Sequence, residues 1–162
     1  MTYQASIPTP YAVLGIHCTT DAITGIDFLP LNTPITEPKN LLAQQLHEAI
    51  QHYLQDPSQL DALPLALAGT PFQQKVWQAI SLIPPGQTLT YTELAQQVGS
   101  GARAVANACG ANPIPLLIPC HRVVAVNGLG GFMKGRKSDS LNIKRWLLDH
   151  EARNERNPPA SS

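Results

Sequence analysis

Long apolar runs, an excess of charge and paired cysteines are all missing from this 162-residue chain. No apolar run approaches the roughly 20 residues that a helix needs to cross a bilayer, so we expect no membrane span and no membrane partner. The N-terminal residues 1–6 carry neither a basic start nor an apolar stretch, and they do not resemble a secretion signal. We therefore expect a soluble, globular, cytoplasmic protein, built as one domain or as a small domain packed on a compact one.

Cysteine is scarce, and its pattern narrows the chemistry. Cys18, Cys109 and Cys120 are an odd number of cysteines without a Cys-x-x-Cys pair. This disfavours both a disulfide framework and a cysteine-rich zinc site. Cys18 lies in an alternating apolar run and Cys109 in an alanine-rich helix, where a small buried residue is the simpler interpretation. Cys120 has a different setting, because an apolar, strand-like run at residues 116–118 leads to it and His121 follows it.

The net charge of zero disguises two halves of opposite sign. Residues 1–99 carry two Lys and Arg side chains against seven Asp and Glu side chains, whereas residues 100–162 carry nine against four. Attraction to phosphate is local and is screened beyond about 10 Å. The asymmetry therefore indicates that the C-terminal half could meet a polyanion, although an ordinary solvated surface would show the same charges.

Local patterns predict a mixed chain of the α/β (α+β) class. Residues 11–18 and 23–29 are rich in β-branched and aromatic residues around a polar separator, which predicts a β-hairpin. Apolar residues three and four apart predict an amphipathic helix over residues 40–55. Residues 59–69 contain leucine and proline without periodicity, and we interpret them as a linker between two lobes.

The segment after the predicted linker has the outline of a helix-turn-helix. A helix is predicted from Phe72 to about residue 83, and residues 90–93 have the form of a capping box that starts a short helix near Tyr91. Gly99, Ser100 and Gly101 then form a turn into a helix over residues 102–111. In that helix small residues surround Arg103, so the backbone could approach a groove closely while one arginine enters it. An alanine-rich helix packed tightly on a neighbour is the alternative.

A cysteine next to a histidine predicts a nucleophile, because imidazole can take the thiol proton directly or through a water and the thiolate attacks carbon. An imidazolium needs a counter-charge, for which Glu151 is a candidate. Thirty residues separate it from His121, so spacing alone carries no geometry. An isolated Cys-His dipeptide is also compatible with a purely structural role.

Several motifs in order carry a resemblance to a known family. Residues 118–123 (IPCHRV) look like the acceptor-site signature of the O6-alkylguanine-DNA alkyltransferases, the methylated-DNA-[protein]-cysteine methyltransferases. Further segments follow in the order of that family: residues 69–77, 84–88, 91–95, 103–105, 110–113 and 144–151. The resemblance implies a ribonuclease-H-like N-terminal lobe (1–68), a mainly helical DNA-binding and alkyl-acceptor domain (69–155), and a disordered tail (156–162).

The resemblance also implies a monomeric DNA repair protein that moves the alkyl group of O6-alkylguanine in double-stranded DNA irreversibly to Cys120, with O4-alkylthymine as a further candidate substrate. Arg103 would fill the gap left by the flipped nucleotide, while Tyr91 would help to displace it and then donate a proton to O6. Glu151, His121 and a water would deprotonate Cys120. The resemblance implies further DNA-binding residues: Ala102, Ala104 and Lys134. It also implies residues around the pocket: Asn112, Val123, Arg122, Met133 and Lys144. No cofactor and no metal are expected, since the zinc ligands of some members are not recognisable here.

Residues 128–135 (GLGGFMKG) depart from the family pattern. Many members have a longer loop with a tyrosine, and Met133 stands where a small residue often donates its backbone amide to O6. Residues 136–140 also lengthen the approach to the last helix. These differences bear on the range of accepted alkyl groups more than on the reaction.

Three alternatives remain open from the residues. A non-catalytic protein that binds alkylated DNA would have the helix-turn-helix without an acceptor cysteine. A helix-turn-helix regulator would normally read the major groove with polar residues, which the alanine-rich helix lacks. A cysteine hydrolase would turn over an acyl intermediate, whereas an alkyl acceptor reacts once.

Overall fold

The computed structural model describes residues 3–130 and 138–156, with the side chains of Gln59, 138–140 and 153–156 left out of the description. The chain forms two compact units, Met1–Leu67 and Ala68–Ser162. The fold is of the mixed α and β class, as predicted. Within the described ranges, no helix has the length and apolar composition that a membrane crossing requires.

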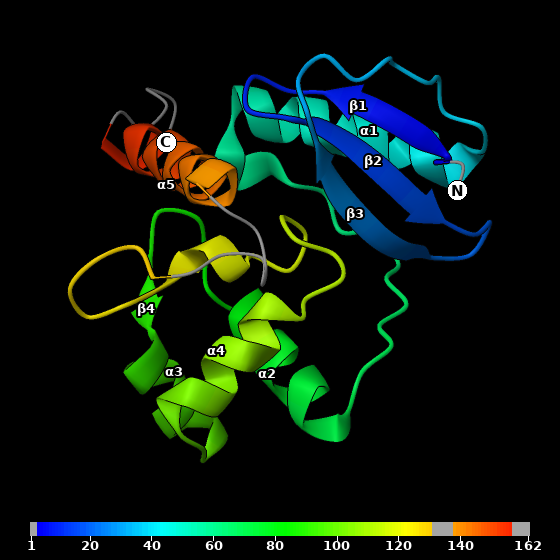
Figure 1. Cartoon of the computed structure of the whole chain (residues 1–162). Coiled ribbons are helices and arrows are strands. Elements are labelled where there is room, and N and C mark those ends of the chain that lie inside the picture. Colours follow the sequence, from blue (N-terminus) through cyan, green and yellow to red (C-terminus); the bar gives the residue numbers. More distant parts are fainter. Residues whose placement is uncertain (1–2, 131–137, 157–162) are drawn as a thin grey trace. The chain divides into compact units, whose positions relative to one another are not determined.

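The N-terminal unit is a three-stranded antiparallel sheet with one long helix. Strands β1 (Ala5–Pro8), β2 (Val13–Cys18) and β3 (Ile23–Leu29) pair in the order β1-β2-β3. Helix α1 (Leu41–Gln55) contacts β1 and β2 and covers one face of the sheet, as Figure 1 shows. The predicted hairpin is thus confirmed, and Asn40 caps the predicted helix by accepting a hydrogen bond from the Ala43 amide. The end of the predicted linker runs beside β3, because Ile23 exchanges backbone hydrogen bonds with Pro64 and Ala66.

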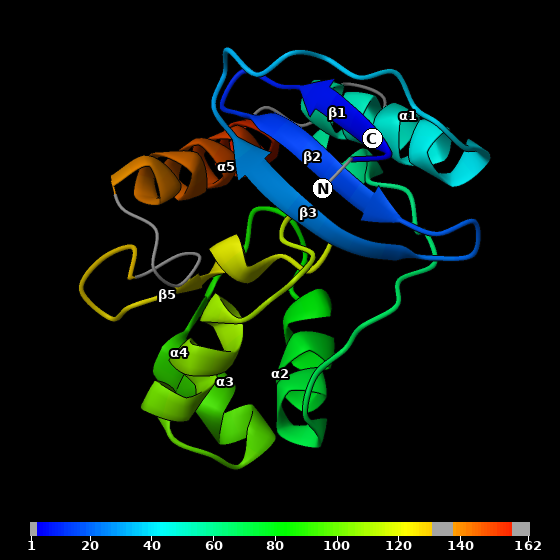
Figure 2. The same cartoon turned by 45° about the vertical axis from the view of Figure 1, so that its right-hand side comes forward.

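The C-terminal unit holds most of the helices and one small parallel sheet. Its elements are α2 (Pro71–Ser81), β4 (Leu89–Thr90), α3 (Tyr91–Val98), α4 (Ala102–Gly110), the 3₁₀ turn η2 (Cys120–Arg122), β5 (Val123–Val124) and α5 (Ser138–Arg156). Helices α2, α3 and α4 pack on one another, and β4 pairs with β5 (Figure 2). The core of these helices includes Val76, Trp77, Leu94 and Val105, all almost completely buried. The predicted helix-turn-helix corresponds to α3 and α4.

Two local signals fix the ends of α3. The Thr90 hydroxyl accepts from the Glu93 amide, and the Glu93 side chain accepts from the Thr90 amide, so the predicted capping box is present. At the other end Gly99 takes a left-handed conformation, with φ 71°, that costs glycine little. Sequence-local hydrogen bonding therefore determines where the first helix of the pair begins and ends.

We expect Thr90→Ala to lower the free energy of unfolding by about 1 kcal/mol, because the Glu93 amide loses its cap acceptor. Urea denaturation followed by circular dichroism measures this change. Thr92→Ala, an exposed substitution in the same first turn, is the matched control and should change stability by less than about 0.5 kcal/mol. Equal losses in the two variants would contradict the capping role.

The prediction of a strand-like run at residues 116–118 is wrong. These residues form a turn in which the Ile118 amide donates to the Ile114 carbonyl and Leu116 has a φ of 79°. Prolines at positions 113, 115 and 119 lack the amide hydrogens that a regular ladder requires. Cys120 therefore lies in a 3₁₀ turn that follows a folded loop, and only Val123–Val124 continue as a strand.

Candidate active site

Cys120 is buried, and hydrogen-bonding groups surround its sulfur. Cys120 is the first residue of η2, and only 4% of its surface is exposed. The Asn112 Nδ2 donates to the Cys120 Sγ at 2.7 Å, and the Sγ donates to the Cys109 carbonyl at 3.4 Å. The thiol therefore has both a donor and an acceptor in place, and its proton already has a partner.

Asn112 holds the loop that leads to the cysteine. Its Oδ1 accepts from the Ile114 amide at 2.9 Å, and its Nδ2 also donates to the Ile118 carbonyl at 2.8 Å. One side chain thus joins the beginning of the loop, its end and the Cys120 sulfur. This arrangement accounts for a folded loop where an apolar run alone predicts a strand.

His121 and Glu151 form a buried pair. His121 Nε2 and Glu151 Oε2 are 2.7 Å apart, and both residues are at most 2% exposed. Arg122 adds two parallel hydrogen bonds to the same carboxylate, from Nε to Oε1 at 2.8 Å and from Nη2 to Oε2 at 2.9 Å. The Nη1 of Arg122 donates to the Ile83 carbonyl at 2.7 Å. Helix α5 is thereby joined to η2, and η2 to the end of α2.

The ionisation of this group follows from burial and hydrogen bonding. Burial alone would raise the pKa of Glu151, but the hydrogen bonds and charges of His121 and Arg122 hold it well below its ordinary value. Burial lowers the pKa of His121 in spite of the nearby carboxylate. At neutral pH the pair is therefore a carboxylate and a neutral imidazole that donates its Nε2 proton.

The thiol of Cys120 is protonated at rest. Burial raises its pKa well above the ordinary value, and the neighbouring Cys109 thiol adds to this effect. Asn112 and Lys144 act in the opposite direction. The nucleophile must therefore lose its proton in the course of a reaction, because little thiolate is present beforehand.

Lys144 is a fully buried cation that connects α5 to the other elements. Its Nζ donates to the Val123 carbonyl at 2.7 Å and lies 5.7 Å from the centroid of the Tyr91 ring. Burial lowers the pKa of Lys144 to about 8. Tyr91 also packs closely on Gly130, whose φ is 72° and where an added Cβ would lie 2.7 Å from the Tyr91 Cε2. Tyr91, Lys144 and Val123 are thus brought together, and the charge of Lys144 acts on the Cys120 thiol.

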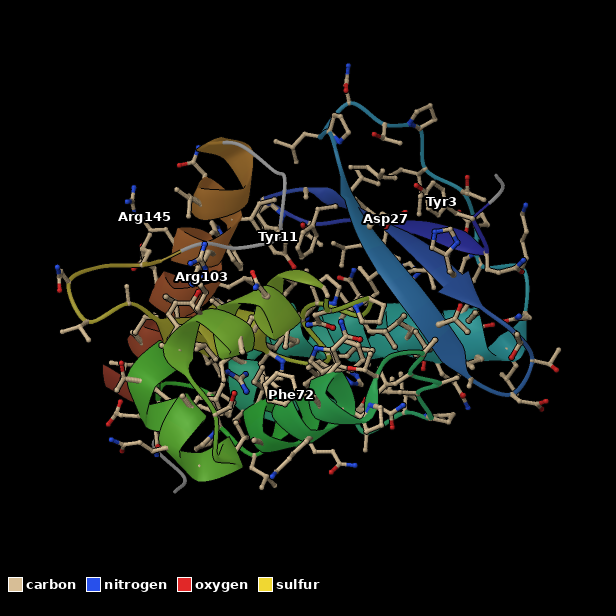
Figure 3. All side chains as sticks on the ribbon, turned by 60° about the horizontal axis from the view of Figure 1, so that its bottom comes forward. Tyr3, Tyr11, Asp27, Phe72, Arg103 and Arg145 are labelled. Carbon is tan, nitrogen blue, oxygen red and sulfur yellow. The ribbon has the colours of Figure 1, made fainter. Side chains whose placement is uncertain are left out.

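Helix α4 links the predicted groove-facing residues to the thiol. Arg103 is exposed near its N-terminal end, as is Ala104, whereas Ala102 is half-buried. Figure 3 shows Arg103 on this helix and Arg145 on α5. Towards the other end, the Cys109 carbonyl contacts the Cys120 Sγ. The Trp77 indole fixes this end to α2 by donating to the Ala108 carbonyl at 2.9 Å.

The structure brings together most of the residues that the sequence singled out. Cys120 and Asn112 share one set of contacts, and His121, Arg122 and Glu151 share a second, which begins at the residue after Cys120. Tyr91, Lys144 and Val123 form a third. Arg103, Ala102 and Ala104 lie on α4 and take part in none of these sets. Met133 and Lys134 lie outside the described residues, and so does most of the loop at 128–135. No group of three or more His, Cys, Asp or Glu side chains within the described ranges could hold a metal ion.

Sequence reasoning missed two contacts of this site. The Cys109 carbonyl accepts a hydrogen bond from the Cys120 thiol, and the carbonyl of Val123, a residue expected around the pocket, accepts one from Lys144. A carbonyl has two lone pairs, so the second contact leaves one acceptor position. Neither contact has a signal in the sequence, because both are backbone groups.

Chemically, this arrangement suits proton removal from a buried thiol. Arg122 and Lys144 are cations and Glu151 is an anion, so the site has one positive charge in excess when Lys144 is protonated. A thiolate at Cys120 would balance this charge. The Nδ1 of His121 has no hydrogen-bond partner among the residues that the structure describes, and it is the basic nitrogen of the tautomer that donates Nε2 to Glu151.

Fold and site together define a helix-turn-helix protein with a buried cysteine, histidine and glutamate group. Residues 71–153 match the DNA-binding domain of the 6-O-methylguanine DNA methyltransferases. The constitutive methylated-DNA–protein-cysteine methyltransferase of Bacillus subtilis is 35% identical over 161 residues, which is 93% of this chain and 96% of that protein. The chain therefore belongs to the 6-O-methylguanine DNA methyltransferase family, as the sequence motifs predicted.

Other relatives match over a shorter region. A probable methylated-DNA–protein-cysteine methyltransferase of Acanthamoeba polyphaga mimivirus is 53% identical over 57% of this chain, and the match spans 60% of that protein. For the Salmonella typhimurium methyltransferase the match spans 53% of that protein, so the chain matches little more than half the length of these two relatives. Among solved structures, Mycobacterium tuberculosis OGT in complex with DNA has a TM-score of 0.75 and 32% identity, with 91% of each chain covered.

Proposed function

We propose that this protein repairs O6-alkylguanine in double-stranded DNA by transferring the alkyl group irreversibly to Cys120. The observation that carries the proposal is the set of contacts at the thiol: a buried sulfur between Asn112 and the Cys109 carbonyl, with a His121–Glu151 pair beside it. The names of the relatives support the same activity. DNA is the partner, the protein acts as a monomer without a cofactor, and the cytoplasm is its place of action.

The chemistry is a single displacement at carbon. The Cys120 proton passes to His121, directly or through a water, and the sulfur attacks the alkyl carbon as the bond from carbon to O6 breaks. Glu151 stabilises the imidazolium. The guanine that leaves takes a proton from the Tyr91 hydroxyl. The His121 imidazolium then gives up the proton that it received and Tyr91 regains one, both by exchange with water, so that the net change is transfer of the thiol proton to guanine. The product is a thioether, and nothing in the scheme regenerates the thiol.

Access to the thiol requires the nucleotide to leave the duplex. A sulfur that is almost completely buried cannot reach O6 of a stacked base, and extrusion costs a few kcal/mol. In this proposal α4 approaches the minor groove through Ala102 and Ala104, and Arg103 occupies the space that the nucleotide leaves. Lys134 would contact DNA as well. Val123, Lys144 and Met133 would border the base, and activity on O4-alkylthymine would use the same displacement.

Stoichiometry tests the proposed function. The reduced protein is incubated with a duplex that contains one O6-methylguanine, and intact-mass and peptide mass spectrometry follow. We expect the mass gain of one methyl group per molecule, on the peptide that contains Cys120, and no turnover beyond one equivalent of DNA. Binding to the alkylated duplex without an adduct would instead support a non-catalytic DNA-binding protein.

Arg103→Ala should slow repair of duplex DNA by about tenfold or more, because the side chain that stabilises the extruded state is missing. The reaction with the free base O6-benzylguanine needs no extrusion and should keep its rate. Rates of adduct formation on both substrates measure the difference. Lys39→Ala removes another exposed cation, in the N-terminal unit, and serves as the control. Equal losses on duplex and free base would contradict the assigned role of Arg103.

A further inference from the structure

Arg122 contacts the Glu151 carboxylate through two hydrogen bonds, although a single nearby positive charge would be enough to balance the charge of this carboxylate. Its guanidinium forms two hydrogen bonds with the two oxygens of Glu151, and its third nitrogen is held by the Ile83 carbonyl. The Arg122 residue is 5% exposed and Glu151 is 2% exposed. A bidentate pair of this kind fixes the plane of the carboxylate as well as its position.

The fixed carboxylate in turn orients the imidazole. Glu151 Oε2 receives both Arg122 Nη2 and His121 Nε2, so His121 must present its Nε2 proton to an oxygen that Arg122 already holds. Since the carboxylate only accepts, this contact selects the tautomer with the proton on Nε2. The lone pair of Nδ1 then remains available to take a proton.

We propose that Arg122 is a positioning residue for alkyl transfer: by clamping Glu151 it fixes the tautomer and orientation of His121, so that Nδ1 is ready to receive the Cys120 proton. The expected effect on the rate of alkyl transfer rests on the proposed function. Its structural consequence, the state of His121, is independent of alkyl transfer.

The charge of Arg122 has an effect separate from its geometry. The charged groups that act on His121 are Glu151 and Lys144 from α5 and Arg122 from η2, with the thiols of Cys120 and Cys109 near the same site. Arg122 and Lys144 lower the pKa of His121, whereas Glu151 raises it, and burial is the largest influence downward. Without Arg122 the negative charge of Glu151 is no longer offset, so the pKa of His121 must rise.

Arg122→Gln and Arg122→Lys separate charge from geometry. Glutamine keeps a hydrogen-bond donor but removes the charge. The acid limb of the pH profile of methyl transfer should therefore move up by about one pH unit. The titration of His121, followed by NMR, should move by the same amount. Lysine keeps the charge but cannot form the two parallel bonds. It should leave the acid limb in place and lower the rate about tenfold at every pH.

Trp77→Phe is the control for a merely structural role, because it removes a buried hydrogen bond of the same unit, to the Ala108 carbonyl, in which neither Arg122 nor Glu151 takes part. It should lower stability and leave the pH profile unchanged. The proposal is overturned if wild-type NMR finds the proton of neutral His121 on Nδ1, or if Arg122→Lys reacts as fast as the wild type. An unshifted titration of His121 in a folded Arg122→Gln protein also overturns it. If that variant does not fold, the tautomer of His121 in the wild type and the rate of the Arg122→Lys variant still test the proposal.

These readouts distinguish failure of this inference from failure of the proposed function. If the wild type forms no methyl adduct, the proposed function fails, while the NMR tautomer and titration of His121 still test the clamp. If the wild type forms the adduct and the Arg122 variants show none of the expected changes, the function stands and the clamp fails.

Discussion

Cys120→Ser is expected to lower methyl transfer by more than about a thousandfold, to the limit of detection by mass spectrometry. A serine hydroxyl is far less acidic than a thiol, and a neutral imidazole of lowered pKa cannot remove its proton to a useful extent. Asn112 and the Cys109 carbonyl can still hydrogen-bond to the smaller oxygen, so the fold should persist. Binding to an alkylated duplex, measured by fluorescence anisotropy, should be retained.

Cys18→Ser is the matched control for the loss of a thiol. Cys18 lies at the end of β2, in the other unit, and its thiol contacts Asn40. This variant should gain one methyl group as the wild type does. A methyl adduct on the Cys120→Ser protein would show that another residue is the acceptor.

Glu151→Gln is expected to produce the largest loss of stability, about 3–5 kcal/mol, since it removes one partner of a buried ion pair and leaves Arg122 without its counter-charge. Methyl transfer should also slow by about a hundredfold, because a neutral amide does not stabilise the His121 imidazolium. Chemical denaturation and single-turnover kinetics measure the two effects. Asp149→Asn neutralises an exposed carboxylate on the same helix and should change stability by less than about 0.5 kcal/mol.

The contribution of Glu151 to stability should also depend on pH in a definite direction. Its pKa in the folded protein is depressed, so the stabilisation is complete above the pKa of the unfolded state and is lost as the pH falls towards the folded value. The difference in unfolding free energy between wild type and Glu151→Gln should therefore shrink between about pH 5 and about pH 3. A difference that stays constant over this interval would exclude the depressed pKa.

Sequence patterns predicted those elements whose signals are local. The hairpin, α1 and α3 have alternation, helical spacing and a capping box within their own residues, and each forms close to the expected bounds. Strand β1 was not predicted, because Ala5–Pro8 is short and its partner β2 supplies the register. The run at 116–118 was misassigned since its conformation depends on Asn112 and on three prolines around it.

For the site, residue types were easier to predict than contacts. The motif predicted Cys120 and His121. Glu151 was a candidate counter-charge from the residues, and only the family resemblance supported its pairing with His121, because spacing across thirty residues carries no geometry. Packing of α5 against η2 creates the 2.7 Å contact between His121 and Glu151. The clamp by Arg122 and the burial of Lys144 arise from the same packing, and no local pattern in the sequence reports them.

The almost complete burial of the Cys120 side chain has a consequence for the lifetime of the unused protein. Under the proposed function each molecule reacts once, so it is lost for repair whenever its sulfur meets an oxidant or a small electrophile before it meets DNA. Cys120 is shielded from collisions with such molecules, and its proton is retained by a raised pKa and by the Cys109 carbonyl. Iodoacetamide should consequently consume the half-exposed Cys18 well before Cys120, so that the capacity for repair outlasts the reactivity of the most accessible thiol.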